Sequence, residues 1–157
     1  MKVMMIFDQT QAGLGGKESP DLPMGGKAMG IGSCEMFTRF LDQQGGKVIA
    51  TLYCGDGTFL ANPELNAKKF AAICGPCFNY ANYGIMAAKS AETISELTNI
   101  PAFAIMSQEC EKAIETYKDK VTILKMPKKG GIGLNESLSA MCEYAKMLVD
   151  KKDTAEF

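Results

Sequence analysis

Residues 2–7, Lys-Val-Met-Met-Ile-Phe, form a short apolar run that stops at Asp8. A run of this length and composition is typical of a buried strand. A second run at residues 47–53, Lys-Val-Ile-Ala-Thr-Leu-Tyr, follows a glycine-rich stretch and a segment of helical periodicity. Two such strands with a helix between them indicate a βαβ unit, and this unit decides the fold.

The rest of the chain repeats this alternation of strand and helix. The first helix is expected after Ser33, whose hydroxyl can cap it. The pattern predicts three further strands, at residues 70–74, 101–106 and 120–125. It predicts further helices at about residues 62–69, 81–98, 109–117 and 138–149.

These elements predict an α/β protein with an open, doubly wound, mainly parallel five-stranded sheet. This is a flavodoxin-like or Rossmann-like three-layer sandwich. Residues 1–150 are expected to form a single domain and residues 151–157 a polar tail.

Composition excludes several classes of function. A net charge of −1 gives no electrostatic reason to expect nucleic acid or an anionic membrane as a partner. We find no apolar run long enough for a membrane span, and Asp8 interrupts the N-terminus too early for a signal peptide, so a cytoplasmic location is expected. Histidine is absent, which excludes Ser–His–Asp and Cys–His catalysis within this chain.

Cysteines gather where predicted strands end. In open α/β sheets, ligands bind outside the carboxyl ends of the strands. Four of the six cysteines lie there: Cys54, Cys74, Cys77 and Cys110. Thiols of a cytoplasmic protein serve redox chemistry or metal binding more often than structural disulfides. We therefore take Cys54, Cys74 and Cys77 as candidate catalytic residues; the alternative is that they are small buried hydrophobic side chains.

The Cys74-Gly-Pro-Cys77 segment allows two interpretations. Its spacing suits a reversible disulfide, and a helix N-terminus beside it would lower the pKa of the first thiol. Alternatively, Cys54, Cys74, Cys77 and Cys110 together supply the four thiolates of a zinc site or an iron–sulfur cluster. A bound flavin is a third, weaker possibility that no sequence feature demands.

Other polar groups share this edge. Glu18, Asp21 and Asp56 provide carboxylates and Lys128–Lys129 provide cations, groups that an amine or amino-acid ligand requires. The loop of residues 8–36 is long for a compact domain, which is typical of a functional or partner-binding segment.

Three segments occur in order on the predicted loops: Gln11-Ala-Gly-Leu-Gly-Gly-Lys-Glu18, Cys54-Gly-Asp56 and Gly75-Pro-Cys-Phe-Asn-Tyr-Ala-Asn-Tyr-Gly84. They resemble the N-terminal part of the component B selenoprotein of glycine, sarcosine and betaine reductases, a family related to D-proline reductase. The resemblance implies an oxidoreductase subunit that serves reductive C–N bond cleavage of a small amino-acid-like substrate in anaerobic amino-acid fermentation. It also implies partner chains that carry a selenocysteine nucleophile and a pyruvoyl group.

The matching segments carry candidate substrate- or partner-binding residues: Gly15, Gly16, Glu18, Asp56, Asn79, Tyr83 and Gly84. Two departures from the family pattern bear on the chemistry. The selenocysteine motif of the family lies beyond the region that this chain covers, so we expect the nucleophile on a partner. Cys74 and Cys77 stand where the family is expected to carry small apolar residues. The alternative function is a non-catalytic binding module that holds an iron–sulfur or zinc site or docks a redox partner.

Overall fold

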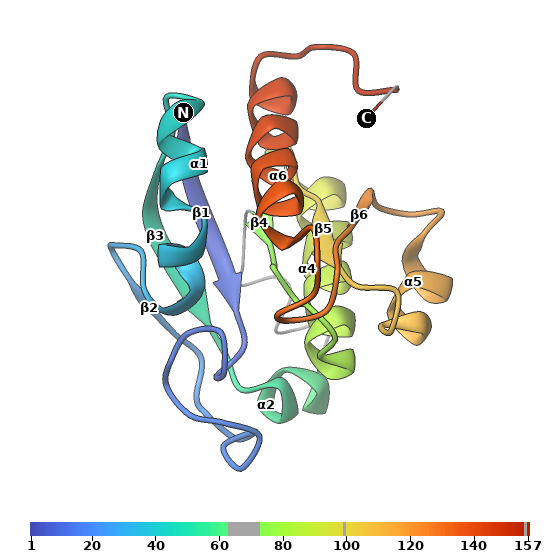
Figure 1. Ribbon diagram of the computed structural model, residues 1–157. Helices are drawn as coiled ribbons and strands as arrows, with labels where there is room; N and C mark the ends of the chain where they lie inside the picture. The colour runs from blue at the N-terminus through green and yellow to red at the C-terminus, as the bar shows by residue number, and fades with distance from the viewer. Residues whose placement is uncertain (63–72, 99, 156) are drawn as a thin grey trace.

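The structure is a computed structural model that describes residues 1–62, 73–98, 100–155 and 157. Its described strands form one sheet in the order β2-β3-β1-β4-β5-β6 (Figure 1). Only β2 is antiparallel to its neighbour. The strands are β1 (Lys2–Phe7), β2 (Gly25–Lys27), β3 (Lys47–Tyr53), β4 (Ile73–Cys74), β5 (Ala104–Met106) and β6 (Ile123–Lys125).

Helices cover both faces of this sheet. α1 and α6 contact each other on one face, whereas α4 contacts both α2 and α5 on the other (Figure 1). This arrangement confirms the predicted three-layer α/β sandwich. The helices are η1 (Gly32–Met36), α1 (Thr38–Gln43), α2 (Asp56–Ala61), α4 (Ala81–Leu97), α5 (Glu111–Tyr117) and α6 (Leu134–Val149).

β1 occupies the centre of the sheet. It pairs in parallel with β3 along its whole length and with β4 through Met5 and Ile6. Both of these side chains and that of Phe7 are buried, as expected for a strand covered on both faces. In chain order, the five parallel strands lie as 2-1-3-4-5, the flavodoxin-like order, with its topological switch point between β1 and β4.

The structure differs from the predicted elements at the carboxyl end of β3. β2 was not predicted, because its Gly-Gly-Lys sequence carries no strand signal. α2 was not predicted either, and it ends at Ala61, before the helix predicted from Asn62. The remainder of that predicted helix, residues 63–69, and residues 70–72 of the predicted third strand lie outside the described residues.

The predicted cap of the first helix is also wrong. The Ser33 hydroxyl donates a hydrogen bond to Gln11 Oε1 at 2.5 Å, which ties the turn η1 to the glycine-rich loop. The α-helix begins later, at Thr38, without a side-chain cap. The predicted and observed bounds of β1 and β3 agree, and α4 ends one residue before its predicted end.

Gly55 fixes the glycine-rich loop against the start of α2. Its backbone N–H donates to the carbonyl oxygen of Leu22 at 2.8 Å. A β-carbon at Gly55 would lie 2.1 Å from the carbonyl oxygen of Pro20 and 2.6 Å from the nitrogen of Leu22. Because both obstacles are backbone atoms, only glycine permits this approach.

We expect Gly55→Ala to lower the free energy of unfolding by about 1–3 kcal/mol, the usual cost of forcing extra volume into a packed region. Gly16→Ala is the matched control, because its β-carbon would meet only the carboxylate end of the exposed Glu18 side chain, which can move aside. This control should change stability by no more than about 0.5 kcal/mol. Urea unfolding followed by circular dichroism measures both, and equal losses would contradict the assigned role of Gly55.

Candidate functional site

A polar pocket of about 430 Å³ lies at the switch point. It is formed by the residues that follow β1, β3 and β4, together with the glycine-rich loop and the first turn of α4. Its size and position are those of small-molecule sites in open α/β sheets. The lining residues are Asp8, Gln9, Thr10, Lys17, Pro20, Asp56, Gly57, Asn79, Tyr80, Ala81 and Asn82.

Asp8 supplies a buried carboxylate to this pocket. It is the first residue after β1, and only 2% of its surface is exposed. Its Oδ1 accepts the backbone N–H of Gln11 at 2.7 Å. Burial raises the pKa of Asp8 to about 6, and the charge of Asp56 adds to the rise; backbone hydrogen bonds and the charge of Lys129 oppose it. Asp8 is therefore a carboxylate that gains from a cationic ligand.

Gln9 fixes the second carboxylate. Its amide nitrogen donates to Asp56 Oδ1 at 3.1 Å, and its amide oxygen accepts the backbone N–H of Asp56 at 3.0 Å. The same Oδ1 accepts the N–H of Gly57 at 3.0 Å. Gln9 is almost fully buried, so this paired contact is shielded from water. Within the described part of the chain, every hydrogen bond to the Asp56 side chain goes to Oδ1, which leaves Oδ2 available to a ligand.

Two lysines bring the opposite charge to the pocket. Lys17 lines it from the exposed glycine-rich loop. The charge of Lys129, in the loop after β6, acts on Asp8 and lowers its pKa. The backbone N–H of Lys129 also contacts Asn79 Oδ1 at 3.5 Å, a long and weak hydrogen bond. The pocket therefore combines the carboxylates of Asp8 and Asp56 with the ammonium groups of these two nearby lysines.

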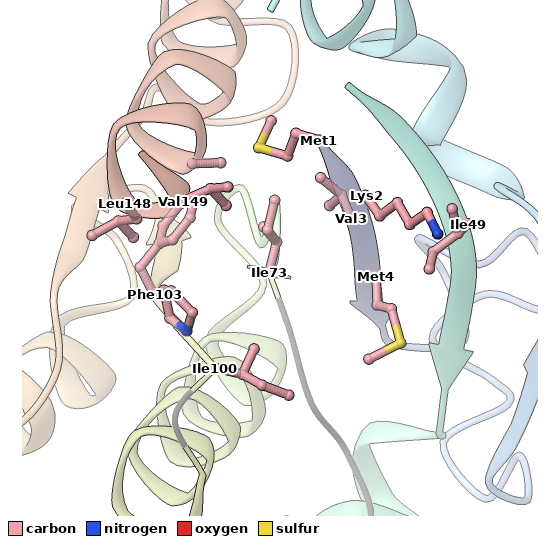
Figure 2. Close-up of a pocket in the computed structure, with 12 residues that line it drawn as sticks. Met1, Lys2, Val3, Met4, Ile49, Ile73, Ile100, Phe103, Leu148 and Val149 are labelled. Atoms are coloured by element: carbon pink, nitrogen blue, oxygen red, sulfur yellow. The ribbon is translucent and has the colours of Figure 1, made fainter. Parts of the chain in front are cut away.

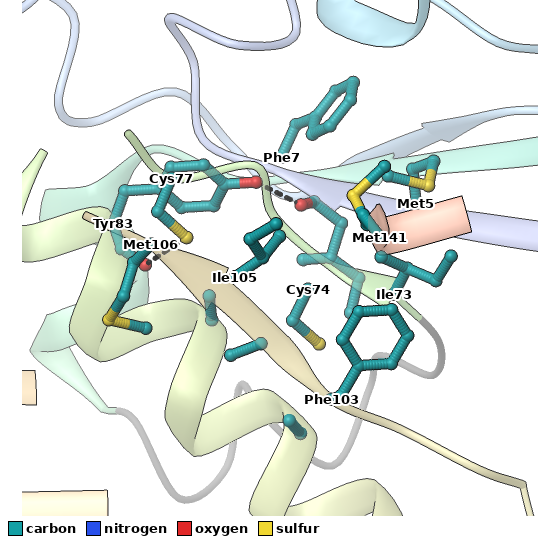
Figure 3. Close-up of a cluster of buried hydrophobic side chains, with 14 of the residues drawn as sticks. Met5, Phe7, Ile73, Cys74, Cys77, Tyr83, Phe103, Ile105, Met106 and Met141 are labelled. Carbon is teal, nitrogen blue, oxygen red and sulfur yellow. Dashed lines mark hydrogen bonds between the residues drawn. The ribbon is translucent and has the colours of Figure 1, made fainter. Parts of the chain in front are cut away.

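The structure places the predicted catalytic cysteines outside this pocket. Cys54, Cys74 and Cys77 are fully buried in the hydrophobic core. Figure 3 shows Cys74 near Ile105 and Phe103, and Cys77 beside Tyr83, with its Sγ 3.8 Å from the Tyr83 carbonyl oxygen. All six cysteines lie within the described ranges and remain thiols outside any disulfide.

Burial determines the chemistry of these thiols. It raises the pKa of both Cys74 and Cys77, the opposite of the lowering expected from a helix N-terminus. The reason is that α4 begins only at Ala81, and its positive end does not offset the loss of water around the sulfur atoms. The role of Cys54, Cys74 and Cys77 in thiol chemistry stays a prediction.

The alternative metal site is not assembled in this structure. Cys110 is buried like the other three thiols, and its Sγ lies 3.5 Å from the carbonyl oxygen of Phe78. Among the described residues, no group of three or more Cys, Asp or Glu side chains is arranged to hold a metal ion. Cys54, Cys74, Cys77 and Cys110 are therefore not gathered as a ligand set.

The predicted binding residues divide into two groups. Asp56 and Asn79 line the pocket. Tyr83 and Gly84 are buried in α4. The Tyr83 hydroxyl donates to the carbonyl oxygen of Ile6 (Figure 3). A β-carbon at Gly84 would lie 3.1 Å from Cys110 Sγ. Their buried contacts are those of packing residues.

The glycine-rich loop contributes only indirectly. The Gly16 N–H donates to Glu18 Oε1 at 2.9 Å on the exposed side of the loop. The Gly16 carbonyl oxygen lies 3.5 Å from the amide nitrogen of Gln9. Gly15, Gly16 and Glu18 do not line the pocket, and their part in binding stays a prediction.

Sequence reasoning missed Asp8 and Gln9. Their signal was their place directly after the first strand, on the edge where ligands bind.

A second, apolar pocket of about 240 Å³ lies at the opposite edge of the sheet. Figure 2 shows it between the start of β1 and the end of α6, with Ile73 and Phe103 at its side. Lys2 is its one charged side chain among the described residues that line it. The described residues of this pocket offer mainly hydrophobic contact, which suits an apolar group better than a polar substrate.

The fold is that of a flavodoxin-like α/β protein, and its polar pocket lies at the switch point, where such sheets usually bind small molecules. Residues 1–156 match the family of the glycine/sarcosine/betaine reductase selenoprotein B, and the chain belongs to this family. Family membership confirms the resemblance seen in the sequence and makes the chain a relative of a reductase component. Comparisons with curated proteins and with solved structures found no match.

Within the described residues, no helix has the length and apolar character needed to cross a membrane.

Asp8 makes stability depend on pH. Its folded pKa of about 6 lies above the ordinary value of 3.8, so between these values the folded state binds more protons than the unfolded state. The stability of the protein therefore falls as pH rises through this window. Asp8→Asn removes the effect, and its stability relative to wild type should improve by about 1–3 kcal/mol between about pH 4 and pH 7. Urea unfolding at intermediate pH values measures this, and a constant difference would contradict the assignment. Glu109→Gln, at an exposed carboxylate of the same edge, is the control and should show no such improvement.

Buried thiols should react slowly with a water-borne reagent. We expect native protein at pH 8 to show little reaction with dithiobis(nitrobenzoate) over minutes, and unfolded protein to react at all six cysteines at once. The increase in absorbance of the released chromophore measures the rate of thiol labelling. Fast labelling of Cys54, Cys74 or Cys77 in the native state would show that these sulfur atoms reach solvent and would favour their predicted catalytic role.

Proposed function

We propose that this chain binds the amino-acid substrate of a glycine/sarcosine/betaine-type reductase complex, and that the switch-point pocket holds that substrate for reductive cleavage of its C–N bond. The observation that carries the proposal is the presence of Asp8, Asp56 and Lys17 in one cavity. Carboxylates and an ammonium group together match the opposite charges of a zwitterionic amino acid. The family of the chain supports the same substrate class.

Each polar residue then has a role in binding. Asp8 and Asp56 hold the substrate ammonium group, and Gln9 keeps Asp56 in place through its two hydrogen bonds. Lys17 faces the substrate carboxylate. Placing each charge opposite its partner fixes the orientation of the carbon between them, which is how a binding subunit contributes to rate.

The covalent chemistry is assigned to partner chains. A selenolate or thiolate of a partner would supply the bond to the substrate carbon as the C–N bond breaks and the amine leaves with the bonding electrons. A partner-borne pyruvoyl group would activate the amine. The buried, protonated state of Cys74 and Cys77 supports this division, because a thiol nucleophile must be ionised and accessible.

The affinity of the chain for glycine, compared with that for molecules carrying only one of its two charges, tests the pocket. In calorimetric titration of the full chain, glycine should bind more tightly than acetate or methylammonium, which each carry one of its charges. Asp56→Asn should weaken glycine binding about tenfold through loss of a charge-assisted contact. Glu109→Gln is the control, since Glu109 is exposed at the same edge and does not line the pocket; it should leave affinity unchanged.

The rate of amine release by the assembled reductase complex is the second measurement. In the complex purified anaerobically, Asp56→Asn should lower kcat/KM for amine release, and Glu109→Gln should not. Failure of wild-type chain to bind glycine or its N-methyl derivatives, or full turnover by Asp56→Asn, would contradict the proposed function.

A further inference from the structure

We infer that the pocket selects ammonium groups that still carry N–H bonds, so that primary and secondary amines enter it and quaternary ammonium groups are rejected. This inference rests on the proposed function, because it concerns the same site. It follows from which acceptors are buried, which of their lone pairs are already used, and which kinds of side chain line the cavity.

Two carboxylates, those of Asp8 and Asp56, are among the hydrogen-bond acceptors that line the pocket. Asp8 is 2% exposed, so its carboxylate has already lost nearly all of its contact with water. A buried carboxylate is tolerated only when hydrogen-bond donors replace that water. A primary or secondary ammonium group brings such donors together with its positive charge, and these charge-assisted hydrogen bonds are the stronger kind.

Asp56 cannot turn away from the ligand. Gln9 holds its Oδ1 and its backbone N–H at 3.1 Å and 3.0 Å, and Gly57 donates to the same oxygen. The orientation of the carboxylate is therefore set before binding. Its Oδ2, which accepts no hydrogen bond from the described residues, remains as the acceptor for an N–H of the ligand.

A quaternary ammonium group fits neither carboxylate. It has no N–H to donate, so it would cover the half-buried Asp56 carboxylate without giving a hydrogen bond to Oδ2. Proteins recognise such groups by surrounding them with aromatic rings. Tyr80 is the one aromatic residue among the described residues that line this pocket, and one ring does not form a cage.

The position of Lys17 sets the orientation of a zwitterionic ligand in the pocket. Lys17 is exposed, whereas Asp8 and Gln9 are buried. A zwitterion that pairs with all of them must place its carboxylate outward and its nitrogen inward. The substituents on nitrogen therefore meet the deepest and least adaptable part of the site.

Glycine, sarcosine and betaine provide the test, because they share a carboxylate and differ in the number of N-methyl groups. In calorimetric titrations of the full chain, glycine and sarcosine should bind at least about tenfold more tightly than betaine. Asp56→Asn should weaken glycine and sarcosine more than betaine and so reduce this ratio. Gln9→Met should reduce it as well, because Asp56 loses its fixed orientation. Circular dichroism confirms that each variant is folded, and Glu109→Gln should keep the wild-type ratio.

The outcomes separate the two claims. Betaine binding as tightly as glycine to the wild-type chain would overturn the inference while leaving the proposed function in place. Binding of none of the three would overturn the proposed function and the inference with it. The wild-type series requires no variant, so the inference remains testable even if a substitution prevents folding.

Discussion

Parallel pairing of β1 with a neighbour on each side is the constraint on which the structure depends. β3 lies along one edge of β1 and β4 along the other, and the connections that follow these strands diverge from the switch point. Divergence leaves a cavity that no strand fills. The first residues beyond β1 are therefore held at the base of that cavity, which places Asp8 and Gln9 in the pocket through backbone geometry.

The carboxyl edge separates two chemical environments. Thiols and aromatic rings face the core beneath the loop after β4, whereas carboxylates and amides face the pocket above it. Desolvation keeps Cys74 and Cys77 protonated, while the same low polarity strengthens any ion pair that Asp8 forms. This separation supports the proposal that the chain holds a charged substrate and that a partner supplies the reactive atom.

The sequence predicted the fold well where the signal is local. β1 and β3 are unbroken apolar runs, and α4 has a long helical period, so their positions agree with the predictions. β2 forms only because β3 offers an edge, which no local pattern reveals. In the site, Asp56 and Asn79 were predicted from their place after strands. The contacts of Gln9 join residues 47 positions apart, and the burial of the cysteines depends on α4 packing, so neither is visible in residue spacing.

The short strand β2 has a consequence for how the protein meets other chains. It covers the outer edge of β3 over Gly25–Lys27, where a β-carbon on Gly25 would lie 2.6 Å from the ring of Tyr53. Its own outer side is only three residues long and ends in an exposed lysine, features that discourage a foreign strand from adding to the sheet. β6, at the opposite margin, is equally short. Neither of these described margins favours growth of the sheet by strand addition, so another protein is not expected to join the sheet through backbone pairing.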